Sequence, residues 1–173
     1  MRRTRRALSI VIAVIMVMAM SVSAFAAGTS SNGARNIALK NAKLTKSQVK
    51  NLKVKYDRKD ADYDVKFIRK SNGAKYDYEI RKSNGKITEK SIEYKVKKNK
   101  SKKKIGKTAA FKKASKMSGV RLAAVKKGRC KYDYDDGQGV YEVKFRNGKY
   151  VYEIEIQAAT GTALEYSWEY KAR

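Results

Sequence analysis

The chain has 173 residues and a formal net charge of +26, from 42 Lys and Arg residues against 16 Asp and Glu. It contains no histidine and one cysteine, which excludes histidine-dependent catalysis, zinc sites built from histidine or several cysteines, and an intramolecular disulfide. A positive charge of this size predicts attraction to polyanions.

Residues 1–26 have the pattern of a secretory signal peptide. A positive region with four arginines precedes an apolar run over residues 7–20, and Ala24-Phe25-Ala26 forms an A-x-A cleavage motif. The apolar run is shorter than the roughly 20 residues that a spanning helix needs. We therefore predict cleavage after Ala26, with retention as a membrane anchor as the alternative.

Cleavage would remove four arginines and no acidic residue, so the net charge would change from +26 to +22. No second apolar run of spanning length follows, and the predicted mature protein has no transmembrane segment. The predicted location is secreted or extracellular, with charge as a means of association with the cell wall. Residues 27–33 are predicted to be a disordered leader.

The rest of the chain contains an internal repeat. Residues 76–95 match residues 152–171 at a constant offset of 76, and YDVKF at 63–67 matches YEVKF at 141–145. Because chance similarity would not preserve this order of segments, we predict a duplication. The predicted first repeat is 34–96, the lysine-rich linker is 97–106, and the second repeat is 107–173.

Each repeat is predicted to open with a helix, followed by a short second helical turn. In the second repeat, apolar residues recur at helical spacing from Ala110 to Met117, with Thr108 as the N-cap and Gly119 as the stop. The first repeat has the same pattern more weakly. Its alanines align with those of the second at an offset of 72, Ala38 with Ala110 and Ala42 with Ala114.

Four antiparallel strands are predicted after each helix, at 52–58, 62–69, 74–82 and 86–96 in the first repeat. Apolar and charged residues alternate along the strands, and Asn-Gly turns separate several of them. Most tyrosines share the phase of Val, Phe and Ile, so we expect them, Tyr132 and Tyr134 included, to pack in the core. Outward Glu and Lys are expected to pair across neighbouring strands.

The predicted fold class is therefore α+β: two tandem modules, each an N-terminal helix or helix pair packed on a four-stranded antiparallel sheet. Lys90 occupies an inward phase, where the second repeat has Tyr166. This difference predicts that the first repeat is the less stable, or that its last strand lies at a sheet edge. Packing the two repeats side by side would hide strand edges.

The lysine-rich linker is the candidate contact for polyanions, because it concentrates positive charge in a stretch without apolar residues. A solvated linker is the alternative. The lysines of this candidate site are Lys97, Lys98, Lys100, Lys102, Lys103 and Lys104.

Other chemistry-bearing residues are few. Aspartates cluster at 60–64 and 133–136, and carboxylates suit calcium, but neither cluster forms an EF-type loop and Asp-Asp-Gly is an ordinary turn. Cys130, between Arg129 and Lys131, is either a reactive thiol or a small packing side chain. No catalytic, metal-binding or cofactor-binding residue is predicted.

The second repeat carries a recognisable succession of motifs. AFKKA at 110–114, SGV at 118–120 and YDDG at 134–137 are followed by VYEVKF at 140–145, YEIEI at 152–156 and A-x-T-G at 158–161. In this order they resemble a PepSY domain over about 107–171. The first repeat, 34–96, departs more, with RKSNG at 81–85 where the family favours Asp-Ala-x-Thr-Gly.

The resemblance implies a helix-on-sheet fold in tandem, no catalytic residues to transfer, and a role in binding and restraining peptidases. The prediction is a secreted, non-enzymatic binding module whose partner is a protein or peptide, with a secreted peptidase as one candidate. The alternative is a cell-surface protein that binds anionic wall polymers or anionic lipid. Nucleic acid is not expected, because the tyrosines that would stack on bases are assigned to the core.

Overall fold

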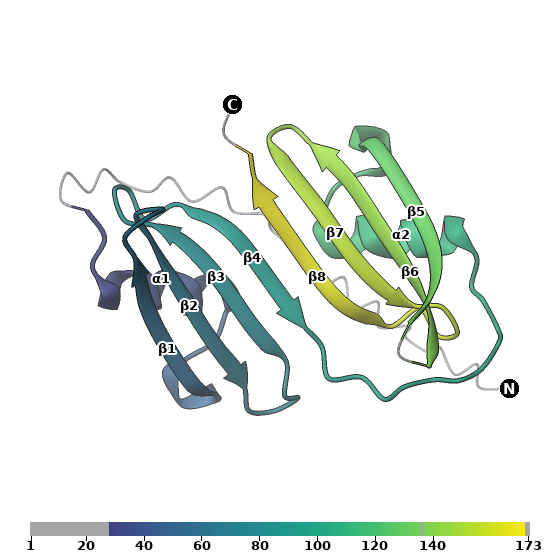
Figure 1. Ribbon diagram of the computed structural model, residues 1–173, viewed down its shortest axis with the longest axis horizontal. Helices are drawn as coiled ribbons and strands as arrows, with labels where there is room; N and C mark the ends of the chain where they lie inside the picture. The colour runs from purple at the N-terminus through teal and green to yellow at the C-terminus, as the bar shows by residue number, and fades with distance from the viewer. Residues whose placement is uncertain (1–27, 136, 172–173) are drawn as a thin grey trace, which may run out of the picture.

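The structure, a computed structural model, describes residues 28–135 and 137–171, and the predicted signal peptide 1–26 lies outside them. The fold is α+β, as predicted. Its elements in chain order are α1 (Ser31–Ala42), η1 (Lys46–Gln48), β1 (Val49–Asp57), β2 (Asp62–Arg69), β3 (Lys75–Arg81), β4 (Ile87–Glu93), α2 (Lys107–Ser118), η2 (Leu122–Ala124), β5 (Lys126–Asp135), β6 (Gln138–Asn147), β7 (Tyr150–Gln157) and β8 (Ala163–Tyr170) (Figure 1).

All eight strands belong to one antiparallel sheet, in the order β1-β2-β3-β4-β8-β7-β6-β5. The prediction of two separate four-stranded sheets is therefore corrected, because β4 hydrogen-bonds to β8 and joins the two sets of strands. This pairing satisfies backbone groups that two separate sheets would leave exposed at their edges. The edges of the sheet are β1 and β5. Lys90 thus lies on a central strand, and the expectation that its strand is an edge is wrong.

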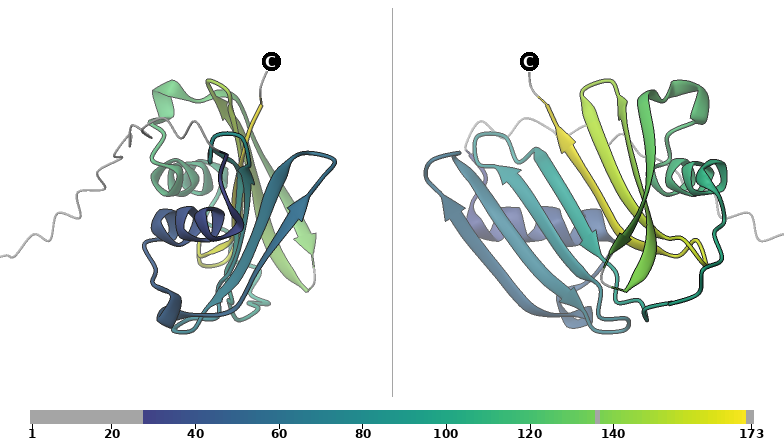
Figure 2. Two further views of the ribbon diagram at one scale, coloured as in Figure 1. Left: turned by 90° about the vertical axis from the view of Figure 1, so that its left-hand side faces the viewer. Right: turned by 45° about the vertical axis from the view of Figure 1, so that its right-hand side comes forward.

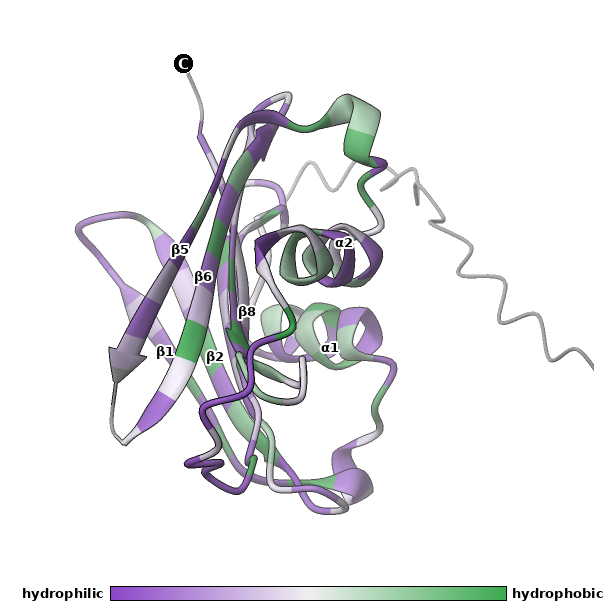
Figure 3. Cartoon of the chain, turned by 90° about the vertical axis from the view of Figure 1, so that its right-hand side faces the viewer, coloured by the Kyte–Doolittle hydropathy of each residue, from purple (hydrophilic) through white to green (hydrophobic). Residues whose placement is uncertain are grey.

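Both helices pack on the same side of the sheet (Figures 2 and 3). Helix α1 contacts β1 and β2, whereas α2 contacts β5, β6 and β7. We call the opposite side, which faces away from both helices, the open face. None of the elements in 28–135 and 137–171 covers it.

The helix ends differ in detail from the predictions. Helix α1 begins at Ser31, inside the predicted disordered leader, and the side chain of Ser30 caps it by accepting a hydrogen bond from the Gly33 N–H at 3.1 Å. Helix α2 begins after Gly106, so Thr108 is not its N-cap. Its predicted stop at Gly119 is observed, with a φ of 70° that glycine adopts without steric cost.

The two helices correspond at an offset of 76 residues, the same offset as the later strands, and not at 72. Ala34 and Ala38 therefore correspond to Ala110 and Ala114, and all four are fully buried. The earlier alignment was one helical turn out of register, because alanines at 34, 38 and 42 repeat every four residues. Their small side chains allow each helix to lie close to the sheet.

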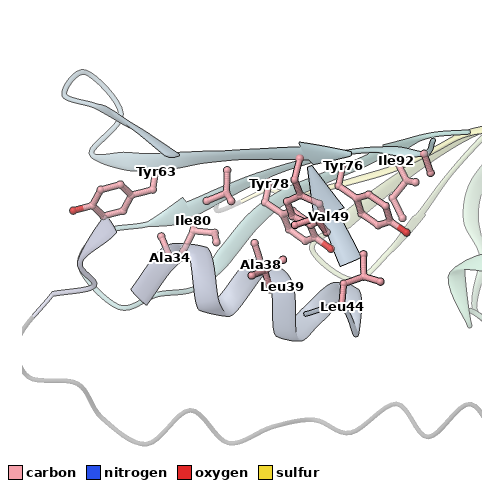
Figure 4. Packing of buried hydrophobic residues seen from close by; sticks show 13 residues of the cluster. Ala34, Ala38, Leu39, Leu44, Val49, Tyr63, Tyr76, Tyr78, Ile80 and Ile92 are labelled. Carbon is pink, nitrogen blue, oxygen red and sulfur yellow. The ribbon is translucent and has the colours of Figure 1, made fainter. Parts of the chain in front are cut away.

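Each half of the sheet has its own hydrophobic cluster beneath its own helix. Tyr78 and Ile80 lie under α1 (Figure 4), in one cluster with Val65 and Phe67. Tyr141, Val143, Phe145, Ile154 and Ile156 form the cluster with the alanines of α2. The predicted inward phase of these strands is confirmed. Burying side chains of this size stabilises the fold by roughly 1.5–3 kcal/mol each. Tyr132 packs against the second cluster, but Tyr134 is 63% exposed, so its assignment to the core was wrong.

Both edge strands contain an irregularity at equivalent places. The pairing register shifts between Lys50 and Lys53 in β1 and between Lys126 and Arg129 in β5. Asn51 and Lys127, 76 residues apart, have φ values of 54° and 52°. Such a bulge interrupts the alternation of side chains, which explains why the first strand was predicted to begin at 52 instead of Val49.

Candidate binding surface

The open face carries the outward residues of all eight strands, and its acids are arranged in rows that cross the strands. The first acidic row consists of Asp64, Glu79, Glu89 and Glu169, each directly paired with the next across β2, β3, β4 and β8. Residues directly opposed in antiparallel strands have Cβ atoms about 4.5–5.5 Å apart. Four carboxyl-bearing side chains therefore stand next to one another.

The second acidic row is displaced along the strands. It consists of Glu93, Glu165, Glu155 and Glu142, paired in turn across β4, β8, β7 and β6. Glu89 and Glu165 are equivalent in the repeat, as are Glu79 and Glu155. The two rows are thus related by an approximate two-fold axis perpendicular to the sheet.

Between the rows lies a middle row with mixed charges. Lys66 pairs with Asp77 at 2.5 Å in the first half, and Lys144 pairs with Glu153 at 2.8 Å at the equivalent place in the second. At its centre Ser91 is directly opposite Ser167. The expected cross-strand pairing of an acid with lysine is found here and at the ends of the acidic rows, where Lys55 opposes Asp64, Lys75 opposes Glu93 and Lys131 opposes Glu142. In the acidic rows, most neighbours across the strands have the same charge, contrary to expectation.

The crowding of carboxylates changes their acidity. Partial burial, together with the charges of Glu89 and Asp64, raises the pKa of Glu79 to about 7. Burial and the charge of Glu169 also raise the pKa of Glu89. Both shifts reflect an environment that disfavours negative charge. Ionisation of Glu79 and Glu89 therefore destabilises the folded state.

A hollow of about 360 Å³ opens on the same face beside the bulge of β1. Charged residues from the middle row and the second acidic row line much of it, and its outward lining includes Lys53, Lys66, Ile68, Lys75, Asp77, Ser91 and Glu93. The Lys75 Nζ lies 2.8 Å from Oε1 of Glu93, and both residues line this hollow. The open face is therefore both charged and indented.

Lys90 lies on the helix side of the sheet, opposite the open face. Its Nζ donates a hydrogen bond to Oδ1 of Asn41 on α1 at 2.9 Å, and the same oxygen accepts from the Tyr78 hydroxyl at 3.2 Å. Burial lowers the pKa of Lys90 to about 8. The hydrogen bond to Asn41 on α1 accommodates the buried lysine. At the equivalent position the other half has the aromatic ring of Tyr166.

The lysine-rich segment 97–104 follows β4 and has no regular secondary structure. All six of its lysines are exposed, but its backbone is attached to the second half of the protein. The buried Gln157 donates to the carbonyl of Lys97 at 2.9 Å, and Gln138 accepts a hydrogen bond from the Asn99 N–H at 3.4 Å. The Lys104 Nζ lies 3.6 Å from the ring centre of Tyr132. The sequence did not predict these attachments, because the glutamines had no recognisable partner.

Positive charge dominates the opposite side of the molecule. No acidic residue occurs between Glu93 and Asp133, a stretch that contains the lysine-rich segment and α2, and α1 has none either. The acids on the open face include every glutamate. The acids are therefore gathered on one side of the sheet, where Lys66, Lys75 and Lys144 also lie, whereas both helices on the other side lack acids.

The remaining candidates from the sequence are not brought together into a site. Among residues 28–135 and 137–171, no group of three or more His, Cys, Asp or Glu is placed to hold a metal ion. Cys130 is half-buried against the second cluster, and burial raises the pKa of its thiol. This environment favours the packing interpretation of Cys130 over the reactive one. No helix in this part of the chain has the length and apolar character to cross a membrane.

These features define an α+β protein that places two helices on one side of an antiparallel sheet and a charged surface on the other. Residues 104–166 match the family model described as peptidase propeptide and YPEB domain, PepSY. The segment from the end of the lysine-rich stretch into β8 is a PepSY domain, as the motifs predicted. Residues 28–103 lie outside the matched region.

Two solved structures align with the chain. A candidate lipoprotein from Clostridium difficile 630 is 19% identical, with 85% of this chain and 96% of that one covered and a TM-score of 0.31. The Bacillus megaterium YpeB C-terminal domain is 12% identical, with 84% and 100% covered and a TM-score of 0.33. At these scores the superposition is too loose to transfer any property. No curated protein is significantly similar in sequence.

Proposed function

We propose that this protein is an exported, non-enzymatic binding module that holds a protein or peptide partner on the open face of its sheet. The observation that carries the proposal is the one-sided cover: both helices occupy one side, and the other side presents an uncovered surface across eight strands. No element of 28–135 and 137–171 covers this surface, so it is accessible to a partner.

Modulation of a peptidase is the activity that the PepSY description of residues 104–166 favours. A peptidase or its propeptide would contact the sheet without any chemistry from this chain. The duplicated sequence supports two tandem PepSY-like units, 34–96 and 107–173, with 97–106 between them. The motif in residues 1–26 supports export, and action outside the cytoplasm follows from it.

The direct test is capture of the partner from the producing cells. Affinity-tagged protein is incubated with secreted and wall proteins, cross-linked and analysed by mass spectrometry, with an unrelated protein of similar net charge as control. A partner that appears only with this protein, and whose peptidase activity changes on addition of the protein, is the expected result. Recovery of the same proteins by the control would contradict the proposal.

A second candidate function is attachment to anionic wall polymers or anionic lipid. The lysines of 97–104 favour it, because all six are exposed and Gln138 and Gln157 hold the backbone of the segment in place. The helix side, without acids in α1 or α2, extends the positive surface. The two functions are compatible, since attachment would use one side of the molecule and partner binding the other.

A further inference from the structure

We propose that the open face binds a lysine- or arginine-rich polypeptide segment of a partner, with the two acidic rows as its contacts. The inference rests on the proposed function and specifies its chemistry. A protein with an excess of positive charge would thus use its acids, gathered on one side, to recognise a cationic ligand.

The arrangement of the acids is the first argument. Like charges directly opposed in neighbouring strands destabilise a sheet, and the chain has 42 cations that could stand between them. Instead Glu89 is opposed by Glu79 on one side and Glu169 on the other, and Glu165 has Glu93 and Glu155 as neighbours. Departures from local rules of this kind are expected at functional sites. Cations brought by a partner would relieve the repulsion.

A buried carboxylate oxygen at the end of the first acidic row is the second argument. The side chain of Asp62, next to Asp64, is 9% exposed. Its Oδ2 accepts a hydrogen bond from Thr88 at 3.3 Å, whereas Oδ1 accepts none within the described chain. The nearest cation is Arg81, whose Nε lies 3.9 Å away. Buried acceptors without a donor are rare, so this oxygen is suited to a donor from a ligand.

The dimensions of the surface select a polypeptide. Four residues in one row cover three strand spacings, about 14 Å, and the rows are separated by four residues of β4, about 13 Å. One metal ion cannot bridge such distances, but a segment with several cationic side chains can reach both rows. A second copy of this chain is disfavoured, because two molecules with a net charge of +22 after signal-peptide cleavage repel each other over their whole surfaces.

The test measures binding of a fluorescent octalysine peptide by anisotropy at pH 8 and low salt. The variant E89Q/E165Q neutralises one acid in each row at equivalent places. The matched control D60N/D133N removes the same charge outside the rows, in the turn after β1 and in β5, where Asp133 is opposed to Val140. We expect E89Q/E165Q to weaken binding about tenfold or more, and D60N/D133N less than about twofold. Equal weakening by both variants, or no binding by the wild type, would overturn the proposal.

A second measurement is independent of the variants. Octalysine added to the isotope-labelled wild type should shift amide resonances of β3, β4 and β8 more than those of α1 and α2, and the reverse pattern refutes the inference. Sedimentation of the protein alone tests for dimers. Dimerisation through the open face would identify a second copy as the occupant, and this result would also refute the inference. If capture from cells yields a specific partner but octalysine does not bind, the proposed function stands and this inference fails.

Discussion

Ser91 on β4 and Ser167 on β8 are directly opposed across the junction of the two halves, and they are also equivalent positions of the repeat, 76 residues apart. A residue paired with its own equivalent in an antiparallel sheet marks an approximate two-fold axis. The axis relates Glu89 to Glu165 and Glu93 to Glu169. The duplication thus produces one symmetric surface from two sets of strands.

This pairing predicts a disulfide between the halves. Directly opposed residues of antiparallel strands have Cα atoms about 4.5–5.5 Å apart, within the range of a disulfide. We expect the variant S91C/S167C to oxidise within one molecule, leaving Cys130 as the free thiol. Non-reducing electrophoresis and thiol titration check the result. The control D77C/S167C places the thiols two strands apart, about 10 Å, and should remain reduced; equal oxidation of both variants would contradict the register.

Substitution of Lys90 by an apolar residue is expected to stabilise the protein. Burial lowers its pKa from 10.5 to about 8, so the charged form costs the folded state up to about 3 kcal/mol. We expect K90M to raise the free energy of unfolding by about 1–3 kcal/mol at pH 7. The gain should shrink as the pH rises from 8 to 10.5, because the wild type then loses its proton in the folded state first and becomes more stable.

Denaturation with urea at several pH values measures this effect. The exposed Lys55 provides the control, since K55M should change stability by less than about 0.5 kcal/mol. A loss of stability in K90M at pH 7 would show that the hydrogen bond to Asn41 outweighs the cost of burying the charge.

The contribution of Glu79 to stability is expected to depend on pH in the opposite direction to that of Lys90. Its pKa is raised from 4.5 to about 7 in the folded state, so its ionisation destabilises the fold as the pH rises through this window. We expect E79Q to be more stable than the wild type by about 1 kcal/mol at pH 8, after allowance for solvent screening. The difference should disappear as the pH falls to 4.5.

Thermal or urea unfolding at pH 4.5, 6 and 8 would reveal the trend. Glu153, an exposed acid paired with Lys144 at 2.8 Å, is the matched control, and E153Q should show no gain at pH 8. A gain for E79Q that is constant with pH would contradict the role of the neighbouring acids.

The lysine-rich segment predicts salt-dependent attachment to anionic surfaces. We expect the protein to bind vesicles of phosphatidylglycerol and phosphatidylcholine, with affinity that decreases as salt increases. Lysines near an anionic membrane contribute about 1 kcal/mol each, so substitution of all six by glutamine should weaken binding at least about a hundredfold. Vesicle co-sedimentation measures the loss. The substituted residues are Lys97, Lys98, Lys100, Lys102, Lys103 and Lys104.

A matched variant distinguishes a site from net charge alone. It carries glutamine at six exposed lysines of η1, β1 and the turns that flank β2, and it has the same net charge. The control residues are Lys46, Lys50, Lys53, Lys55, Lys59 and Lys70. If both variants lose binding equally, the lysine-rich segment is not a distinct contact.

The sequence by itself determined the local pattern of this protein. Alternation with a period of two assigned Val143 and Phe145 to the core and Glu142 to the outside, because successive side chains of a strand point to opposite faces. The repeat indicated that both halves have the same elements, and the motifs from 110 to 161 identified the PepSY domain. These properties depend on neighbours in the chain, so they can be inferred without coordinates.

Only the tertiary structure decided how the halves combine. No local pattern distinguishes β4 paired with β8 from two separate sheets, because the pairing joins residues 72 to 80 positions apart through backbone groups that every residue possesses. Register across that junction places Glu89 beside Glu169 and Glu93 beside Glu165. The acidic rows exist because of this long-range pairing. The pairing is favoured because it satisfies backbone groups at two strand edges, and it thereby determines where the charged side chains lie.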